Sequence, residues 1–116
     1  MTDRPQTVPD VKRRALLDAA MAEFEKSGLD GASMRAIAAT AGVTTGAIYS
    51  MFGGKSALYA ALLFESLDRL EAHVRAAVTA QQEPLAAVDA SVMAFFEYYN
   101  ARLFEAQLGL HSFSGF

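Results

Sequence analysis

The sequence predicts an all-α protein, and three observations predict this class. Apolar residues recur at intervals of three and four along most of the chain, which is the period of a helix that buries one stripe of its surface. No segment alternates apolar and polar residues as a half-buried strand does. The 53% share of hydrophobic residues and only three prolines in 116 residues are typical of a folded globular chain rather than a disordered one.

The first helix is predicted over residues 11–27. Its inward face carries four apolar residues at helical spacing, Leu17, Ala20, Met21 and Phe24. Gly28 follows and suits the left-handed conformation in which helices commonly end. Residues 1–10, MTDRPQTVPD, are predicted to form a disordered N-terminal arm.

Two short helices follow. Ser33 is placed to cap the first, over residues 34–40, and Thr44 to cap the second, which runs to about Phe52 and ends at Gly53-Gly54. Two short helices joined by a tight glycine turn form a helix-turn-helix. Because neither is long enough to be stable alone in water, packing against the first helix must hold them.

The second half of the chain predicts longer helices. One spans residues 57–80, and another begins with Pro84 at its first helical position. Phe95, Tyr99 and Leu103 of this last helix follow the periodicity of a core stripe. They belong to a larger apolar set: Leu85, Val88, Val92, Phe95, Phe96, Tyr99 and Leu103. Residues 109–116, GLHSFSGF, are predicted to be a frayed tail. We expect five or six helices, with a helix-turn-helix DNA-binding domain over residues 11–55 and part of a second helical domain over residues 56–116.

Charge is unevenly distributed along the chain. The formal net charge is −3, but residues 1–55 contain seven basic and six acidic side chains, whereas residues 56–116 contain three basic and seven acidic ones. The first part therefore carries +1 and the second −4. Any attraction to a polyanion is expected in the first part.

Composition excludes several classes of protein. The chain has no cysteine, which rules out disulfides and thiolate metal sites and fits the cytoplasm. No apolar run approaches the roughly 20 residues of a membrane-spanning helix. His73 and His111 lie far apart without metal-ligand spacing, and no serine stands in a nucleophile motif. We expect no cofactor, no metal and no enzymatic activity.

The segment GVTTGAIYSMFGGKS, residues 42–56, ends like a nucleotide-binding P-loop. A P-loop needs a glycine five positions before the Gly-Lys pair, so that backbone N–H groups can curl around the phosphates. Tyr49 occupies that position, and no strand precedes it. The spacing therefore excludes the P-loop.

A helix that begins at Thr44 would turn Ile48 and Phe52 to one side and Gly46, Tyr49 and Ser50 toward the other. The second face would offer hydroxyl groups and close backbone approach to a major groove. The N-termini at Ser33 and Thr44 would meet phosphates, and Lys55 would supply a mobile positive charge. The simpler alternative is that these residues are ordinary caps and an exposed lysine.

The order of these features resembles a known family. Residues 14–62, with AA, a phenylalanine four positions on, a glycine, SMRAIA, AGVTTGAIY, F and K, resemble the N-terminal DNA-binding region of TetR-family transcriptional regulators. The resemblance implies a three-helix DNA-binding domain followed by a helical domain for effector binding and dimerisation. It assigns DNA contact to Ser33, Arg35, Thr44, Thr45, Gly46, Tyr49 and Lys55, with Ala47 and Ser50 also on the recognition helix. Arg35 is the candidate for a guanine contact, because its planar fork matches O6 and N7.

The resemblance also implies partners: a palindromic double-stranded DNA operator, a small-molecule effector and a second subunit. The chain departs from the family pattern in two places. Met51 stands where many members have a histidine that can donate to phosphate. The two helices that usually pair between subunits are missing, which leads us to expect a fragment of a longer regulator and makes a homodimer of this chain doubtful.

The expected function is transcriptional repression relieved by a small apolar or amphipathic effector. Phe96 and Tyr98 lie off the predicted core stripe and are the effector-pocket candidates. The alternative function is a helical ligand-binding or protein-interaction module that keeps the helix-turn-helix only as a scaffold.

Overall fold

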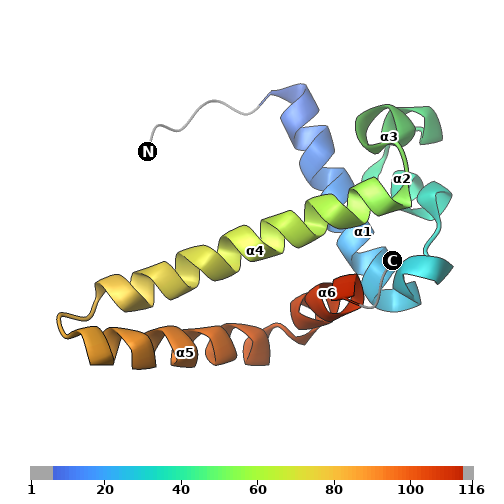
Figure 1. The fold of residues 1–116 in the computed structure, drawn as a ribbon. Coiled ribbons are helices and arrows are strands. Elements are labelled where there is room, and N and C mark those ends of the chain that lie inside the picture. Colours follow the sequence, from blue (N-terminus) through green and yellow to red (C-terminus); the bar gives the residue numbers. More distant parts are fainter. Residues whose placement is uncertain (1–6, 114–116) are drawn as a thin grey trace. The chain divides into compact units, whose positions relative to one another are not determined.

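A computed structural model describes residues 7–113, which form six α-helices without a strand (Figure 1). The all-α class is confirmed. The helices are α1 (Val8–Gly31), α2 (Met34–Ala41), α3 (Thr45–Phe52), α4 (Lys55–Thr79), α5 (Pro84–Ala101) and α6 (Leu103–Phe113). The chain divides into two compact units, one up to Leu62 and one from Leu63 onward, so α4 contributes to both.

Helix α1 begins earlier than the sequence predicts. Thr7 Oγ1 accepts from the Asp10 N–H, and the Asp10 carboxylate accepts from the Thr7 N–H, each at 3.2 Å. This reciprocal pair satisfies amides that a helix N-terminus leaves without partners, and Pro9 fits the first turn. The predicted arm of residues 1–10 is therefore too long, since residues 8–10 are helical. Residues 1–6 lie outside the described part of the chain.

Gly28 interrupts α1 rather than ending it as the sequence predicts. Its backbone is not helical, with φ 72° and ψ 174°, a region that essentially only glycine occupies. A further helical turn, residues 29–31, follows it before Ala32 ends the element. The long regular part of α1 is thus separated from a short terminal turn that leads into α2.

The core of the N-terminal unit comes from all of its helices. Buried apolar side chains include Leu16, Leu17, Ala20 and Phe24 of α1, Ile37 and Ala38 of α2, Ile48 and Phe52 of α3, and Leu58, Tyr59 and Leu62 of α4. The Phe24 and Tyr59 rings meet edge to face, with centroids 5.6 Å apart. Because the first two turns of α4 supply core residues, the unit extends past the expected boundary at residue 55.

In the second unit α5 lies beside α4 after a short connection (Figure 1). The predicted core stripe of this segment is largely wrong. Phe95 and Leu103 are exposed, and Tyr99 is only half-buried. Leu85, Val88 and Val92 of the same apolar set are exposed as well. Ala94 and Tyr98 are the buried residues of α5 instead. Helical periodicity identifies an apolar face, but it does not show whether a neighbouring helix covers that face. None of the described residues of this unit covers the exposed apolar face of α5.

The C-terminal segment also differs from its prediction. Residues 109–113 belong to α6 rather than to a frayed tail, and Leu108 of the same helix is 1% exposed. Residues 114–116 lie outside the described part of the chain. None of the described helices is by itself long and apolar enough to cross a membrane, although the pair α3 and α4, bent by 62°, reaches that length and composition together.

Candidate nucleic-acid interface

The turn between α2 and α3 is built by Gly42. Its φ of 76° is left-handed, and the N–H groups of Gly42 and Val43 return to the carbonyls of Ala39 and Ala38 at 3.2 and 2.9 Å. These bonds satisfy the last carbonyls of α2 within two residues. Chain direction therefore changes in a tight glycine turn, as the sequence predicts.

Both helices of the motif are capped by the residues that the sequence indicates. Ser33 Oγ accepts from the Ala36 N–H, and Thr44 Oγ1 accepts from the Ala47 N–H, each at 3.1 Å. Gly53 ends α3 with φ 77°, and its N–H donates to the Tyr49 carbonyl at 2.9 Å. The helix-turn-helix is thus defined at all four ends by local hydrogen bonds.

Helix α3 has two chemically different faces. Ile48 and Phe52 are buried. The opposite face is exposed and consists of small or hydroxyl-bearing residues: Thr44, Thr45, Gly46, Tyr49 and Ser50. Ala47 lies between the two faces and is half-buried. The structure therefore brings the predicted recognition residues together on one surface.

Gly46 leaves open space on that surface. A Cβ atom built at this position would meet nothing closer than Thr44 Oγ1 at 3.8 Å, which is an ordinary contact. Its φ is not in the left-handed region. The fold itself therefore does not require glycine here, and the absence of a side chain permits close approach from outside.

Arg35 is exposed on α2 and makes no hydrogen bond or ion pair with any residue in the range 7–113. Its guanidinium donors are therefore available to a partner. Ser33 is also exposed, but its backbone N–H donates to the Glu23 carboxylate of α1 at 3.1 Å. The Ser33 hydroxyl remains able to donate, whereas its amide is occupied. Glu23 was missed from the sequence because it lies ten residues from Ser33.

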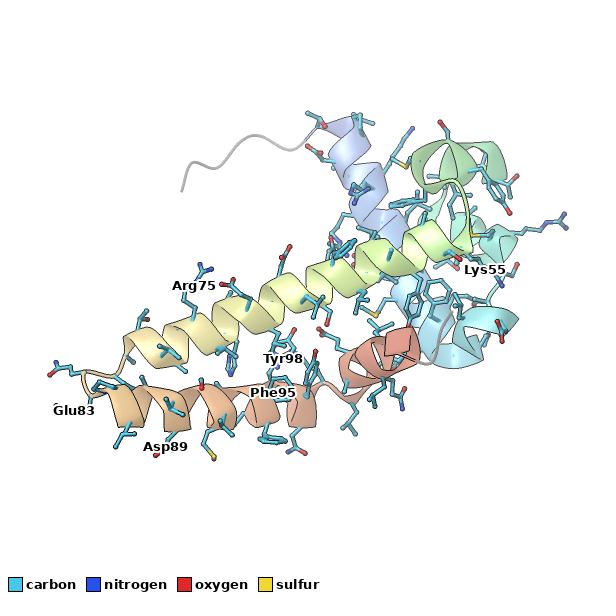
Figure 2. The ribbon with its side chains drawn as sticks, in the orientation of Figure 1. Lys55, Arg75, Glu83, Asp89, Phe95 and Tyr98 are labelled. Atoms are coloured by element: carbon cyan, nitrogen blue, oxygen red, sulfur yellow. The ribbon has the colours of Figure 1, made fainter. Side chains whose placement is uncertain are left out.

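Lys55, at the start of α4, is not the mobile charge that the sequence predicts. Figure 2 labels Lys55 where α4 begins. Its ammonium donates to the carbonyl oxygens of Leu29, Asp30 and Ala32 at 3.0, 3.2 and 3.0 Å. The carbonyls at the end of α1 lack helical partners, and a lysine in reach satisfies them. Its three donors are thus directed inward.

The basic cluster of α1 contributes one residue near the motif. The Arg13 guanidinium lies 4.9 Å from the centroid of the Phe52 ring, at the end of α3. Arg14 instead pairs with Asp18 one turn along α1, at 3.0 Å. The two arginines are neighbours in the sequence, and only packing separates their roles. Met51 is half-buried and adds no donor to the surface.

The two effector-pocket candidates have different surroundings. Phe96 is 63% exposed and lines a groove of about 380 Å³ along α5 and α6, together with Met93, Glu97, Tyr99, Asn100, Leu103 and Ala106. Tyr98 is buried, at 3% exposure, so its predicted place off the core is wrong. Its hydroxyl donates to Glu105 Oε1 at 2.7 Å and accepts from Arg69 Nε at 3.2 Å. Phe96 can therefore touch a ligand, whereas Tyr98 belongs to the helix packing.

Burial raises the pKa of the Tyr98 hydroxyl, and the hydrogen bond to Glu105 raises it further. Tyr98 is therefore a neutral donor at physiological pH. No group of three metal-binding side chains occurs among residues 7–110, whose side chains the structure describes.

A three-helix unit with a capped turn and an exposed polar recognition face defines a helix-turn-helix protein. The sequence profile described as "Bacterial regulatory proteins, tetR family" matches residues 16–62. The DNA-binding unit of the chain is therefore that of the tetR family, and the resemblance seen in its sequence is confirmed.

Relatives with known names carry the same region. The chain is 35% identical over 95 residues to the HTH-type transcriptional repressor KstR2 of Mycobacterium tuberculosis, covering 82% of this chain and 48% of that protein. It is 36% identical over 89 residues to the HTH-type transcriptional activator FasR of Mycolicibacterium smegmatis, covering 77% of this chain and 41% of that one. The chain thus spans about half the length of the curated relatives it matches.

The fold is shared with solved structures. A TetR-like transcriptional regulator from Rhodococcus sp. RHA1 superposes with a TM-score of 0.72 at 24% identity, over 91% of this chain and 56% of that one. This likeness includes both units of the chain and supports the all-α architecture.

Proposed function

We propose that this protein is a sequence-specific DNA-binding transcriptional regulator that reads a major groove with α3. The exposed face of α3 carries the proposal, because it is small and hydroxyl-rich while Ile48 and Phe52 anchor the opposite face in the core. A helix of this kind fits the width of a major groove. The match of residues 16–62 to the tetR family supports the same function.

Each proposed contact has a chemical role. Arg35 reads guanine O6 and N7 through its fork, and Tyr49 reaches a phosphate or a thymine methyl group. The hydroxyls of Ser33, Thr44, Thr45 and Ser50 donate to phosphates or base edges, while Gly46 and Ala47 permit close approach. Lys55 belongs to the same predicted set, but its three donors are occupied by the backbone carbonyls of Leu29, Asp30 and Ala32.

The regulator is proposed to act in the cytoplasm, as a repressor that a small-molecule effector releases from a palindromic operator. A dimer is proposed for a longer form of the protein. Phe96 and the groove beside it are the proposed effector contacts, and Tyr98 acts only by holding α5 in place. The named relatives include a repressor and an activator. A reporter gene downstream of the operator would therefore show whether this protein represses or activates transcription.

The test uses a duplex that the chain selects from a random pool. For a DNA-binding protein, the logarithm of the binding constant falls linearly with the logarithm of the salt concentration. The slope is set by the number of phosphates that the protein contacts. Arg35→Ala is expected to weaken binding by about 1–3 kcal/mol and to relax preference at one base pair. Binding without salt dependence, or an Arg35→Ala variant that selects the same sites as the parent, contradicts this function.

The groove along α5 favours one alternative, a ligand-binding or protein-interaction module in which the helix-turn-helix is only a scaffold. The exposed apolar side chains of α5 and the excess of acidic residues after position 55 are the observations behind it. Such a module would bind apolar ligands and select no duplex from the pool.

A further inference from the structure

Lys55 connects the two ends of the helix-turn-helix. Its three hydrogen bonds go to carbonyls of residues 29, 30 and 32, and Ala32 directly precedes Ser33, the cap of α2. Lys55 itself follows Gly53-Gly54, where α3 ends. One side chain therefore joins the segment that enters the motif to the segment that leaves it.

The geometry uses the full capacity of the ammonium. A protonated lysine has three N–H donors and no acceptor, and the three carbonyls receive all of them. The contacts to Leu29 and Ala32 are partly buried. Moving the ammonium to a phosphate would leave these carbonyls without partners, which is costly for buried polar groups. The positive charge also suits the negative end of the α1 dipole.

Closure of the motif matters because its helices are short. Helices α2 and α3 have eight residues each, and helices of this length are not stable alone. A link between the two ends limits how far α2 can shift relative to α3. It thus holds Arg35 of α2 in register with the exposed face of α3.

We infer that Lys55 is a positioning residue for DNA reading: it closes the base of residues 33–53 rather than neutralising a DNA phosphate. The inference rests on the proposed function, since it concerns how Arg35 and α3 reach the same site. A positioning lysine and a phosphate-binding lysine make opposite predictions for three measurements: the salt slope, the preference among duplexes and the effect of arginine.

The experiment compares Lys55→Met and Lys55→Arg with the parent chain, and Lys12→Met serves as the control. Lys12 is exposed on α1 and has no hydrogen bond or ion pair within the described residues, so its replacement removes the same charge without affecting a carbonyl. The probes are the duplex selected by the parent chain and poly(dI-dC). Affinity is measured across a salt series, and melting temperature is measured without DNA.

We expect Lys55→Met to lower the ratio of selected-duplex to poly(dI-dC) affinity by about tenfold, which is the typical effect of one mismatched base pair in a recognition site. The salt slope stays that of the parent, and Tm falls by several degrees while Lys12→Met leaves it unchanged. Lys55→Arg behaves like Lys55→Met, because a planar fork cannot direct three donors onto carbonyls grouped around one point. If Lys55→Met does not fold, the salt slope and the ratio of selected-duplex to poly(dI-dC) affinity are measured on Lys55→Arg.

The opposite pattern overturns the inference. If Lys55 contacts a phosphate, Lys55→Met should reduce the magnitude of the salt slope by about 1 and weaken binding to all duplexes equally. Lys55→Arg should then bind as the parent does. If the parent selects no duplex, the proposed function fails separately. The melting comparison still decides the role of Lys55 in that case, because equal Tm values for Lys55→Met and Lys12→Met would exclude it as a structural link.

Discussion

The two units of this chain distribute apolar and polar groups in opposite ways. In the N-terminal unit Ile37, Ile48 and Leu58 are fully buried, and the exposed face of α3 consists of small or hydroxyl-bearing residues. In the second unit α5 exposes Leu85 and Phe96. The first unit completes its core with the residues described, whereas the second leaves an apolar face of α5 open.

A polar cluster holds the helices of the second unit together. The Glu105 carboxylate of α6 accepts from Ser66 Oγ of α4 at 2.6 Å and from the Tyr98 hydroxyl of α5 at 2.7 Å, and it pairs with Arg69 at 3.1 Å. Three helices therefore meet at one carboxylate. Apolar packing specifies the first unit, and hydrogen bonding to a single charge contributes much of the specificity in the second.

The largest expected effect contrasts one apolar deletion in each unit. Ile48→Ala should lower the free energy of unfolding by about 2–5 kcal/mol, because it leaves a cavity in a fully buried site. Leu85→Ala should change it by no more than about 0.5 kcal/mol, because that side chain is exposed. Urea unfolding of both variants measures the difference. A comparable loss at Leu85 would show that another surface covers α5 in solution.

Removal of the central carboxylate is expected to have the next largest effect. Glu105→Ala leaves the buried hydroxyl of Ser66 and that of Tyr98 without an acceptor, and should cost about 1–3 kcal/mol of unfolding free energy. Glu97→Ala is the matched control, since Glu97 is exposed on α5. Thermal melting compares the two. Equal Tm values would mean that the cluster is not a source of stability.

Glu105 also makes stability depend on pH. Burial alone would raise its pKa, but the hydrogen bonds from Ser66 and Tyr98 and the charge of Arg69 together lower the pKa below its usual value. A lowered pKa stabilises the fold above the ordinary carboxyl pKa of about 4.3, and this contribution disappears as pH falls through the folded pKa. The Tm difference between the parent and Glu105→Gln should therefore shrink from pH 7 to pH 3. A constant difference would assign the effect to another carboxylate.

The last prediction concerns the recognition face and separates folding from function. Gly46→Ala should stabilise the chain by up to about 1 kcal/mol, because alanine favours a helix more than glycine does and the fold leaves room for Cβ. Affinity for the selected duplex should nevertheless fall by about tenfold, because the added methyl group blocks close approach. Melting and DNA titration of one preparation test both effects. An unchanged affinity would remove Gly46 from the contact surface.

Sequence alone determined the features that depend on local chemistry. Ser33 and Thr44 cap their helices, Gly28, Gly42 and Gly53 interrupt or end them with positive φ, and Pro84 begins α5. Each depends on bonds or torsions within a few residues, so residue type and spacing are sufficient. The buried face of α3 followed from helical periodicity for the same reason.

Only the tertiary structure decided which surfaces are covered and which donors are free. Periodicity marked Phe95 and Tyr99 as core, but the buried residues of α5 are Ala94 and Tyr98, because a neighbouring helix selects the covered face. Lys55 and Glu105 are both ordinary charged residues in the sequence. Several of the partners that define their roles, among them Ala32 and Leu29 for Lys55 and Ser66 for Glu105, lie 23 or more residues away, where short-range patterns carry no signal. Folding brings these groups together, because buried carbonyls and carboxylates need partners from anywhere in the chain.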